Sequence, residues 1–356
     1  MRLEALGWND HAAASFRSVA EPLWEPGRVT SEHQHIYRVA LETTERFAVV
    51  SGRFRHQAAA RESYPAVGDW VAIEERPTET RAVIHAVLPR RSRFSRKVAG
   101  DETREQVVAA NIDTVFIVLG LDGDFNLNRL QRYLVTVREG GAAPVVVLNK
   151  RDVCADTDAR VQEAEAVAPD APVVAMSCRS GEGFDRLEAW LTPASTVALL
   201  GSSGTGKSSI LNRLLGRDVR RTIDVRARDS RGRHATTHRE LWLLPSGALL
   251  IDTPGMRELQ LWDVGERLGS TFDDIHELGA GCHFRDCQHD EEPKCAVKAA
   301  VAGGTLNQAR LDYFRQLRRE QRHLAAKQDE RAELDDKRRA KIQQKALRAH
   351  TRQRPR

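Results

Sequence analysis

The chain has 356 residues, a net charge of +5 at neutral pH and charged side chains at 29% of its positions, so it is long enough for two or three domains. It contains no run near the roughly 20 apolar residues of a membrane-spanning helix, and its first residues lack the apolar core of a signal peptide. We therefore expect a cytoplasmic protein with no membrane partner, and the small basic excess favours an acidic partner.

The first 94 residues have the pattern of a small β-domain. Short apolar or alternating runs at residues 36–41, 47–50, 70–73 and 81–88 are separated by turn residues. Strands of this kind predict a β-barrel, and an OB-fold-like barrel is the commonest one that binds nucleic acid. Composition leaves two roles open for this barrel, which are nucleic-acid binding and packing against the neighbouring domain.

A basic segment follows the predicted barrel. Residues 90–97 hold five Lys or Arg, which indicates either a solvated linker or contact with nucleic-acid phosphates. Residues 95–260 then have the pattern of an α/β domain. Apolar runs at 114–119 and 144–148 predict buried parallel strands, and the helical spacing at 128–137 predicts a helix between them.

The second of these strands runs directly into the tetrapeptide Asn149-Lys150-Arg151-Asp152. The Asp152 carboxylate can accept hydrogen bonds from guanine N1–H and the 2-amino group together. Adenine offers neither donor and would leave a buried carboxylate unpaired. Asn149 would hold the loop and the purine edge, while the Lys150 stem would pack on the ring. This tetrapeptide therefore predicts a guanine-reading site.

The next apolar strand ends at a loop that begins with Ser177 and Cys178. This loop occupies the place from which a backbone N–H reaches guanine O6. Cys178 can be interpreted as a reactive thiol, but we favour a small side chain that allows the backbone to approach the base closely. Beyond it, residues 184–191 show one helical face.

A glycine-rich segment at residues 201–208 has the spacing GxxxxGK[ST], between an apolar strand pattern and a helical one. Its glycines let backbone N–H groups turn toward one centre, and the following helix N-terminus adds a partial positive charge, so it predicts a phosphate-binding loop. Lys207 would reach the β- and γ-phosphates, and the Ser208 hydroxyl would bind Mg²⁺. The residues expected at the phosphates are Gly201, Ser202, Ser203, Gly204, Thr205, Gly206, Lys207, Ser208 and Ser209.

The arginine-rich segment at 220–238 has too few apolar residues for a core element, so we expect a mobile loop. Within it, Thr236 or Thr237 could complete the Mg²⁺ shell when a γ-phosphate is present. Farther along, an apolar strand leads into a DTPG sequence. There, Asp252 would hold a water of Mg²⁺, and the Gly255 N–H would sense the γ-phosphate.

If a nucleotide bound at these loops is hydrolysed, the water that attacks its γ-phosphate needs a group to orient it. Met256 follows the DTPG sequence, where many GTPases carry a glutamine, and a thioether cannot orient water. His234 is the best candidate because it lies in the predicted mobile loop and its imidazole titrates near neutral pH. The alternative is that His234 contacts only RNA or solvent. The predicted catalytic residues are therefore His234, Lys207 and Thr237.

A cluster of cysteine and histidine characterises residues 261–330. The spacing Cys282-x4-Cys287-x-His289-x5-Cys295 offers three thiolates and one imidazole, which is a closed ligand set typical of structural zinc. Metal binding would supply the folding energy that this short segment lacks. In the remaining tail, residues 331–356, the last 20 residues hold nine Lys or Arg and no acidic residue, so the tail is either solvated or an arm for RNA.

The order of the motifs is informative, because the guanine-reading box precedes the phosphate loop, whereas in ordinary small GTPases it comes last. A circular permutation explains this order, since ligand loops at strand ends do not depend on where the chain begins. The chain resembles the RsgA (YjeQ) family of circularly permuted GTPases from about residue 30 to 320. The supporting residues are Val67-Gly68-Asp69-Trp70, Glu105-Gln106, Asn111-Ile112-Asp113, the NKRD box, Gly232-Arg233-His234 and the Cys/His cluster.

This resemblance implies a multidomain α/β protein with an N-terminal OB-like β-barrel, a circularly permuted P-loop GTPase domain and a C-terminal zinc-binding helical subdomain. It further implies a monomer that binds the small ribosomal subunit and its rRNA, uses GTP with Mg²⁺, and assists late subunit maturation. Hydrolysis of GTP to GDP and phosphate would be slow alone and faster on the subunit. The alternatives are a GTPase of large-subunit assembly and a GTP-binding rRNA checkpoint protein with negligible turnover.

Overall fold

The computed structural model describes residues 2–58, 61–76, 79–98, 101–123, 125–216, 239–252, 272–308, 310–312, 314–315 and 318–319. Its contacts divide the chain into two units. One unit consists of Met1–Lys97 and Glu105–Gln260, and the other of Val98–Arg104 and Leu261–Arg356. The domain boundaries expected at residues 94, 260 and 330 stay a prediction.

The N-terminal strands close into a barrel. In the order β1-β2-β3-β5-β4 each strand pairs with the next, and β4 pairs back onto β1. The pairings are antiparallel except that of β3 with β5. Alternate residues such as Val29, Tyr37 and Val39 are fully buried inside it. The predicted OB-like barrel is therefore confirmed. Its elements are η1 (Leu3–Leu6), α1 (Asp10–Val19), β1 (Trp24–His33), β2 (Ile36–Ala40), β3 (Glu45–Val50), α2 (Gly52–Gln57), η2 (Arg61–Ser63), β4 (Trp70–Glu74) and β5 (Ala82–Val87).

The second part of this unit is a mostly parallel sheet in the order β10-β9-β8-β11-β13-β12, in which β12 alone is antiparallel to its neighbour β13. A separate two-stranded sheet, β6-β7, precedes it in the chain. The strands are β6 (Arg93–Val98), β7 (Asp101–Ala110), β8 (Thr114–Gly120), β9 (Ala143–Asn149), β10 (Val173–Ala175), β11 (Thr196–Leu200), β12 (Arg239–Leu243) and β13 (Leu249–Asp252). The helices are α3 (Leu127–Glu139), η3 (Arg151–Val153), α4 (Thr157–Val167), η4 (Asp185–Trp190) and α5 (Lys207–Leu215).

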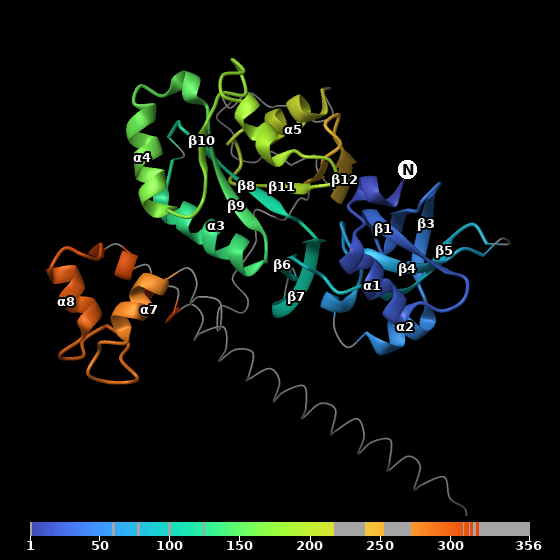
Figure 1. The fold of residues 1–356 in the computed structure, drawn as a ribbon, viewed down its shortest axis with the longest axis horizontal. Coiled ribbons are helices and arrows are strands. Elements are labelled where there is room, and N and C mark those ends of the chain that lie inside the picture. Colours follow the sequence, from blue (N-terminus) through green and yellow to red (C-terminus); the bar gives the residue numbers. More distant parts are fainter. Residues whose placement is uncertain are drawn as a thin grey trace, which may run out of the picture. The chain divides into compact units, whose positions relative to one another are not determined.

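Helices cover both faces of this sheet, and the side chains of β8 show how. Val115, Ile117 and Leu119 pack with the buried residues of α3 and α4, whereas Phe116 and Val118 pack with those of α5. Figure 1 shows the helices α3, α4 and α5 beside this sheet. Every residue of β8 is buried, as expected for a parallel strand covered on both faces. The helix expected near residues 184–191 is a short 3₁₀ helix, η4.

The described part of the second unit is small. It includes the helices α7 (Asp273–Gly279) and α8 (Ala296–Ala302). Phe272 and Phe314 pack edge to face, with ring centroids 5.2 Å apart, and an ion pair joins Asp274 to Arg310. Across both units, no helix that the structure describes is long and apolar enough to span a bilayer.

Candidate functional site

The predicted nucleotide loops meet at one edge of the parallel sheet. Strands β9, β10 and β11 are parallel to β8 and to one another, so the loops that follow their last residues lie at the same edge. The NKRD box begins at the last residue of β9, the loop beginning with Ser177 follows β10, and the glycine-rich loop follows β11. The fold therefore brings together residues that lie up to about 60 positions apart in the chain.

The glycine-rich loop has the backbone that its glycines were expected to allow. Gly204 and Gly206 both have positive φ, at 83° and 97°. A Cβ on Gly206 would lie only 2.1 Å from Asn149 Nδ2, so the neighbouring loop leaves no room for a side chain there. The Lys207 ammonium lies over the loop and donates hydrogen bonds to the carbonyls of Gly201, at 2.7 Å, and Ser202.

Asn149 connects the three loops. Its side chain is almost completely buried; Nδ2 donates to the Thr205 carbonyl at 2.8 Å, and Oδ1 accepts from the Cys178 N–H at 3.0 Å. One amide group thus holds the phosphate loop on one side and the predicted base-reading loop on the other. The bond to Thr205 is buried and the bond to Cys178 is partly buried, so losing either would leave a polar group short of a partner.

Asp152 is exposed and accepts a hydrogen bond from the Ser177 hydroxyl at 2.6 Å. The Ser177 oxygen in turn accepts from the Ser180 N–H at 3.1 Å, so the carboxylate and the loop are held in a fixed relation. Burial raises the pKa of the Cys178 thiol, which disfavours a reactive thiolate and agrees with the interpretation of Cys178 as a small spacer.

Sequence reasoning missed Asp122, whose carboxylate pairs with the Lys150 ammonium at 2.5 Å. Lys150 has a positive φ of 70°, which turns its side chain out of the end of β9. The signal in the sequence was an acidic residue just beyond the end of β8, the strand next to β9, but only the strand order shows that these two ends are neighbours.

The γ-phosphate side of the predicted site is described only in part. Asp252 is the last residue of β13 and is half-buried. His234, Thr236, Thr237, Gly255 and Met256 lie outside the described residues. Of the three predicted catalytic residues, the structure therefore describes only Lys207.

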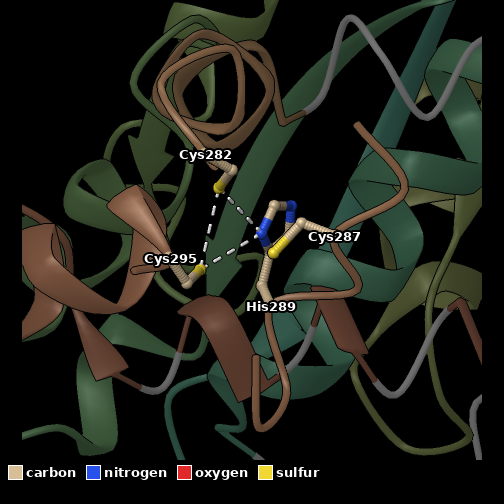
Figure 2. Close-up of side chains that lie close together, drawn as sticks. All are labelled: Cys282, Cys287, His289 and Cys295. Carbon is tan, nitrogen blue, oxygen red and sulfur yellow. Dashed lines mark hydrogen bonds between the residues drawn. The ribbon is translucent and has the colours of Figure 1, made fainter. Parts of the chain in front are cut away.

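The cysteine and histidine ligand atoms of the second unit converge (Figure 2). The sulfurs of Cys282, Cys287 and Cys295 and a ring nitrogen of His289 all lie within 4.8 Å of one another. The sulfurs of Cys282 and Cys295 are 3.8 Å apart, and His289 Nδ1 lies 3.6 and 3.4 Å from them. A tetrahedron with metal–sulfur bonds of about 2.3 Å has sulfur–sulfur edges of about 3.8 Å. The group can therefore hold a metal ion.

The start of α8 assists this cluster. Burial alone would raise the pKa of the Cys282 thiol, but the backbone N–H groups of Val297 and Ala296 face the sulfur and hold its pKa below the usual value. Cys287 is buried, and burial raises the pKa of its thiol to about 11. A cation among the ligands would offset that cost, because metal ligation favours the thiolate.

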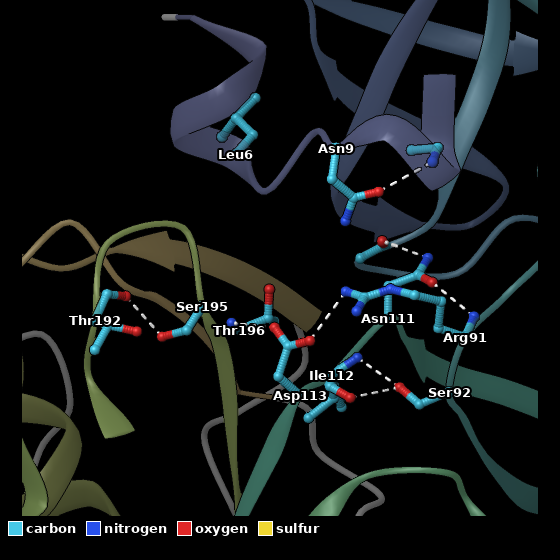
Figure 3. Close-up of polar contacts among 12 residues, drawn as sticks. Leu6, Asn9, Arg91, Ser92, Asn111, Ile112, Asp113, Thr192, Ser195 and Thr196 are labelled. Carbon is cyan, nitrogen blue, oxygen red and sulfur yellow. Dashed lines mark hydrogen bonds and ion pairs between the residues drawn. The ribbon is translucent and has the colours of Figure 1, made fainter. Parts of the chain in front are cut away.

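Part of the basic segment at 90–97 forms ion pairs inside its own unit. Arg90 forms a bidentate ion pair with the fully buried Asp69, at 2.8 and 2.7 Å. Arg91 pairs with Asp113 at 2.9 Å, and the other Asp113 oxygen accepts from the Thr196 N–H (Figure 3). Arg90 and Arg91 therefore form ion pairs inside their own unit, a role that neither a solvated linker nor phosphate contact had predicted.

The chain is similar to a family of known proteins over most of its length. A family model described as RsgA GTPase matches residues 87–262. The small ribosomal subunit biogenesis GTPase RsgA of Opitutus terrae is 47% identical over 347 residues, which cover 94% of this chain and 95% of that protein. The protein of the same name from Xylella fastidiosa (strain 9a5c) is 46% identical over 326 residues, which cover 89% of this chain and 93% of that protein.

Two solved structures share the fold. The crystal structure of YjeQ from Thermotoga maritima matches with a TM-score of 0.63 at 28% identity, over 84% of this chain and 98% of that one. That of YloQ, described as a circularly permuted GTPase, matches with a TM-score of 0.59 at 27% identity, over 83% of this chain and 94% of that one. The circular permutation predicted from the motif order is thereby confirmed, and the chain belongs to the RsgA GTPase family.

Proposed function

We propose that this GTP-hydrolysing enzyme acts on the small ribosomal subunit and assists its late maturation. Two curated relatives that match nearly the whole chain are named small ribosomal subunit biogenesis GTPases. The structural observation that supports the nucleotide-binding part of the proposal is Asn149, which holds the phosphate loop and the predicted base-reading loop together. These relatives do not favour a role on the large subunit.

For the nucleotide, we assign Asp152 to the guanine N1–H and 2-amino group, with the loop from Ser177 facing O6. Lys207 would bind the β- and γ-phosphates. Mg²⁺ would be held by the Ser208 hydroxyl and Thr236, with Asp252 on one of its waters, and it would neutralise charge on the phosphates. The start of α5 and the end of β13 supply hydroxyl and carboxylate oxygens, the ligands that Mg²⁺ prefers.

For the second unit, we assign one structural Zn²⁺ to the three cysteines and His289. A set of three thiolates and one imidazole is typical of zinc and leaves no open position for a reactive water. We further assign rRNA contact to the barrel and to the basic tail at 331–356, and propose that the protein works as a monomer in the cytoplasm. Counterion release predicts that binding to the subunit weakens steeply with salt.

One experiment tests the proposed partner. GTP turnover is measured alone, with purified small subunits and with purified large subunits. We expect acceleration by small subunits only, because the proposal places the activating contacts there. Equal acceleration by both subunits, or none by either, would contradict the proposal; the latter result would favour a GTP-binding checkpoint protein with negligible turnover.

A second experiment tests the proposed water-positioning residue. His234→Ala should abolish the subunit-stimulated rate, by roughly the 10²–10⁴-fold typical of general acid–base groups, with little change in GTP affinity. His238→Ala, four residues farther along, serves as the matched control. If the stimulated rate survives in a His234→Ala protein that still binds subunits, another group positions the water.

A further inference from the structure

Arg213 lies in the last turn of α5, the helix that begins at Lys207, and its guanidinium reaches the loop after β10. Its Nη1 donates a hydrogen bond to the Cys178 carbonyl at 3.1 Å. Its guanidinium carbon is 4.9 Å from the centre of the Phe184 ring, within the range of a cation–π contact. The guanidinium thus contacts both ends of the loop at 178–184.

The middle of the same loop is also shaped around Arg213. Gly181 has a φ of 90°, and a Cβ built on it would lie 2.4 Å from Arg213 Nη2. The backbone at Gly181 therefore runs directly against the guanidinium, in a positive-φ conformation that favours glycine. The Gly181 N–H closes the turn by donating to the Ser177 carbonyl at 2.9 Å.

Residue 178 is consequently held from both sides. Its N–H is donated to Asn149, and its carbonyl accepts from Arg213. Fixing the carbonyl of Cys178 fixes the plane of the peptide that follows, because that peptide is rigid. The direction of the N–H in that peptide, which belongs to Arg179, is then set by one side chain from β9 and one from α5.

We infer that Arg213 is a positioning residue for recognition of the guanine 6-oxo group. It does not touch the nucleotide; it orients the backbone N–H of the peptide after Cys178, in the loop that faces this oxygen. Because Arg213 and Lys207 belong to the same helix, it also ties the base-reading loop to the phosphate loop. This inference rests on the proposed function, in which the loop from Ser177 reads guanine.

The test compares two nucleotides that differ only at position 6. In 6-thioguanosine triphosphate, sulfur, a weaker acceptor than oxygen, replaces the 6-oxo group, while N1–H and the 2-amino group remain. Dissociation constants for both nucleotides are measured by displacement of a fluorescent GDP from the full-length protein. The variants are Arg213→Ala, Arg213→Lys and the control Arg76→Ala, which removes an exposed barrel arginine paired with Glu74 and Glu79.

We expect Arg213→Ala to weaken the binding of GTP about fivefold and that of the thio analogue less, so that the preference for oxygen over sulfur falls. The effect is limited because Arg213 is exposed to solvent. Arg213→Lys should restore part of the preference because an ammonium can still donate to the Cys178 carbonyl. Arg76→Ala should change neither constant. An unchanged preference in Arg213→Ala and Arg213→Lys, or an equal loss for both nucleotides, would overturn the inference.

A wrong assignment of the guanine site would give a different experimental result from a wrong role for Arg213. The preference of the unmodified protein for GTP over ATP, and its loss in Asp152→Asn, are measured in the same assay. If Asp152→Asn keeps that preference, the proposed guanine site is wrong and the inference for Arg213 falls with it. If Asp152→Asn loses it while the Arg213 variants behave like the unmodified protein, only the role of Arg213 is overturned.

Discussion

The nucleotide loops and the Cys/His cluster are the two proposed binding sites, and they differ in what supports them. The nucleotide loops rest on fully buried strands such as β8 and β11 and are joined by hydrogen bonds within the protein, chiefly those of Asn149. The cluster joins two short helices with few buried apolar side chains around them, and its four ligand atoms face one another. The first site is therefore expected to exist before its ligand binds, whereas the second needs its ligand in order to fold.

Removal of the metal should give the largest effect. Chelation, or Cys287→Ala, should unfold the region at 282–295, since structural zinc contributes about 10–16 kcal/mol in small zinc domains. GTP affinity should stay within about twofold of its starting value, because the nucleotide loops belong to the other unit. Hydrogen exchange of peptides from both regions, zinc content and GTP titration measure these effects.

The matched control is Cys154→Ala, a half-buried cysteine outside the cluster, which should change neither zinc content nor exchange. If a protein lacking both Cys282 and Cys287 still holds one zinc per chain, the assignment of the ligands is wrong. If GTP binding is lost on chelation, the two sites are not independent and the comparison fails.

The base-reading carboxylate should give the next largest effect. Asp152→Asn should weaken GTP binding by about 3 kcal/mol, since hydrogen bonds to a charged group contribute about 1.5–3 kcal/mol. The binding of xanthosine triphosphate should be weakened much less. The hydrogen bond from Ser177 can persist with an amide oxygen, so the loop should keep its shape.

Both nucleotides are titrated against Asp152→Asn to measure this effect. Asp158→Asn, on the exposed first turn of α4, serves as the control. Equal losses for guanosine and xanthosine triphosphate would remove Asp152 from base reading. A loss of zinc in Asp152→Asn would again contradict the independence of the two sites.

The close approach of two loops at Gly206 allows a sharper test of whether the nucleotide site is formed before its ligand binds. Gly206→Ala should weaken GTP binding about tenfold or more, because its Cβ would displace the Asn149 amide and its φ is strained for alanine. Gly216→Ala is the matched control: it also has a positive φ, of 64°, but nothing lies within 4 Å of its Cβ. Equal GTP affinities of these two variants would mean that the contact with Asn149 does not shape the site.

The parts of the fold that the sequence predicts are those in which local chemistry decides the outcome. The apolar run before Asn149 predicts a buried strand, and the glycines before Lys207 predict a phosphate loop, because no other element is needed to explain either pattern. The spacing of the four metal ligands likewise predicts a closed site. In each case a few neighbouring residues carry the whole signal.

The residues that sequence reasoning missed act across elements. Arg28 is fully buried between the barrel and the parallel sheet, where it donates to the carbonyls of Gly68 and Asn111 and to the Thr196 hydroxyl. Burial lowers its pKa to about 10. A lone arginine in the sequence gives no sign of such partners, since they lie up to 168 positions away along the chain.

Asp122 likewise has its partner on another element of the fold. Its substitution gives the smallest of the predicted effects. Its ion pair with Lys150 is partly exposed, with side-chain exposures of 35% and 23%, so the surrounding water screens it. Pairs of this kind contribute about 0.2–1 kcal/mol. Asp122→Asn should therefore weaken GTP binding by at most about fivefold at low salt, by freeing the Lys150 stem that is proposed to pack on the purine.

Salt provides the measurement that separates this effect from a direct contact. The Debye length falls from about 10 Å at 0.1 M to about 3 Å at 1 M, so the ratio of GTP affinities between Asp122→Asn and the unmodified protein should approach one as salt rises. Glu163→Gln, which breaks an exposed pair with Arg160 on α4, should give a ratio near one throughout. A loss far above fivefold that persists at high salt would mean that Asp122 contacts the nucleotide itself. Equal affinities at low salt would mean that the ion pair does not hold Lys150 in place, leaving Asn149 as the main support of this edge of the site.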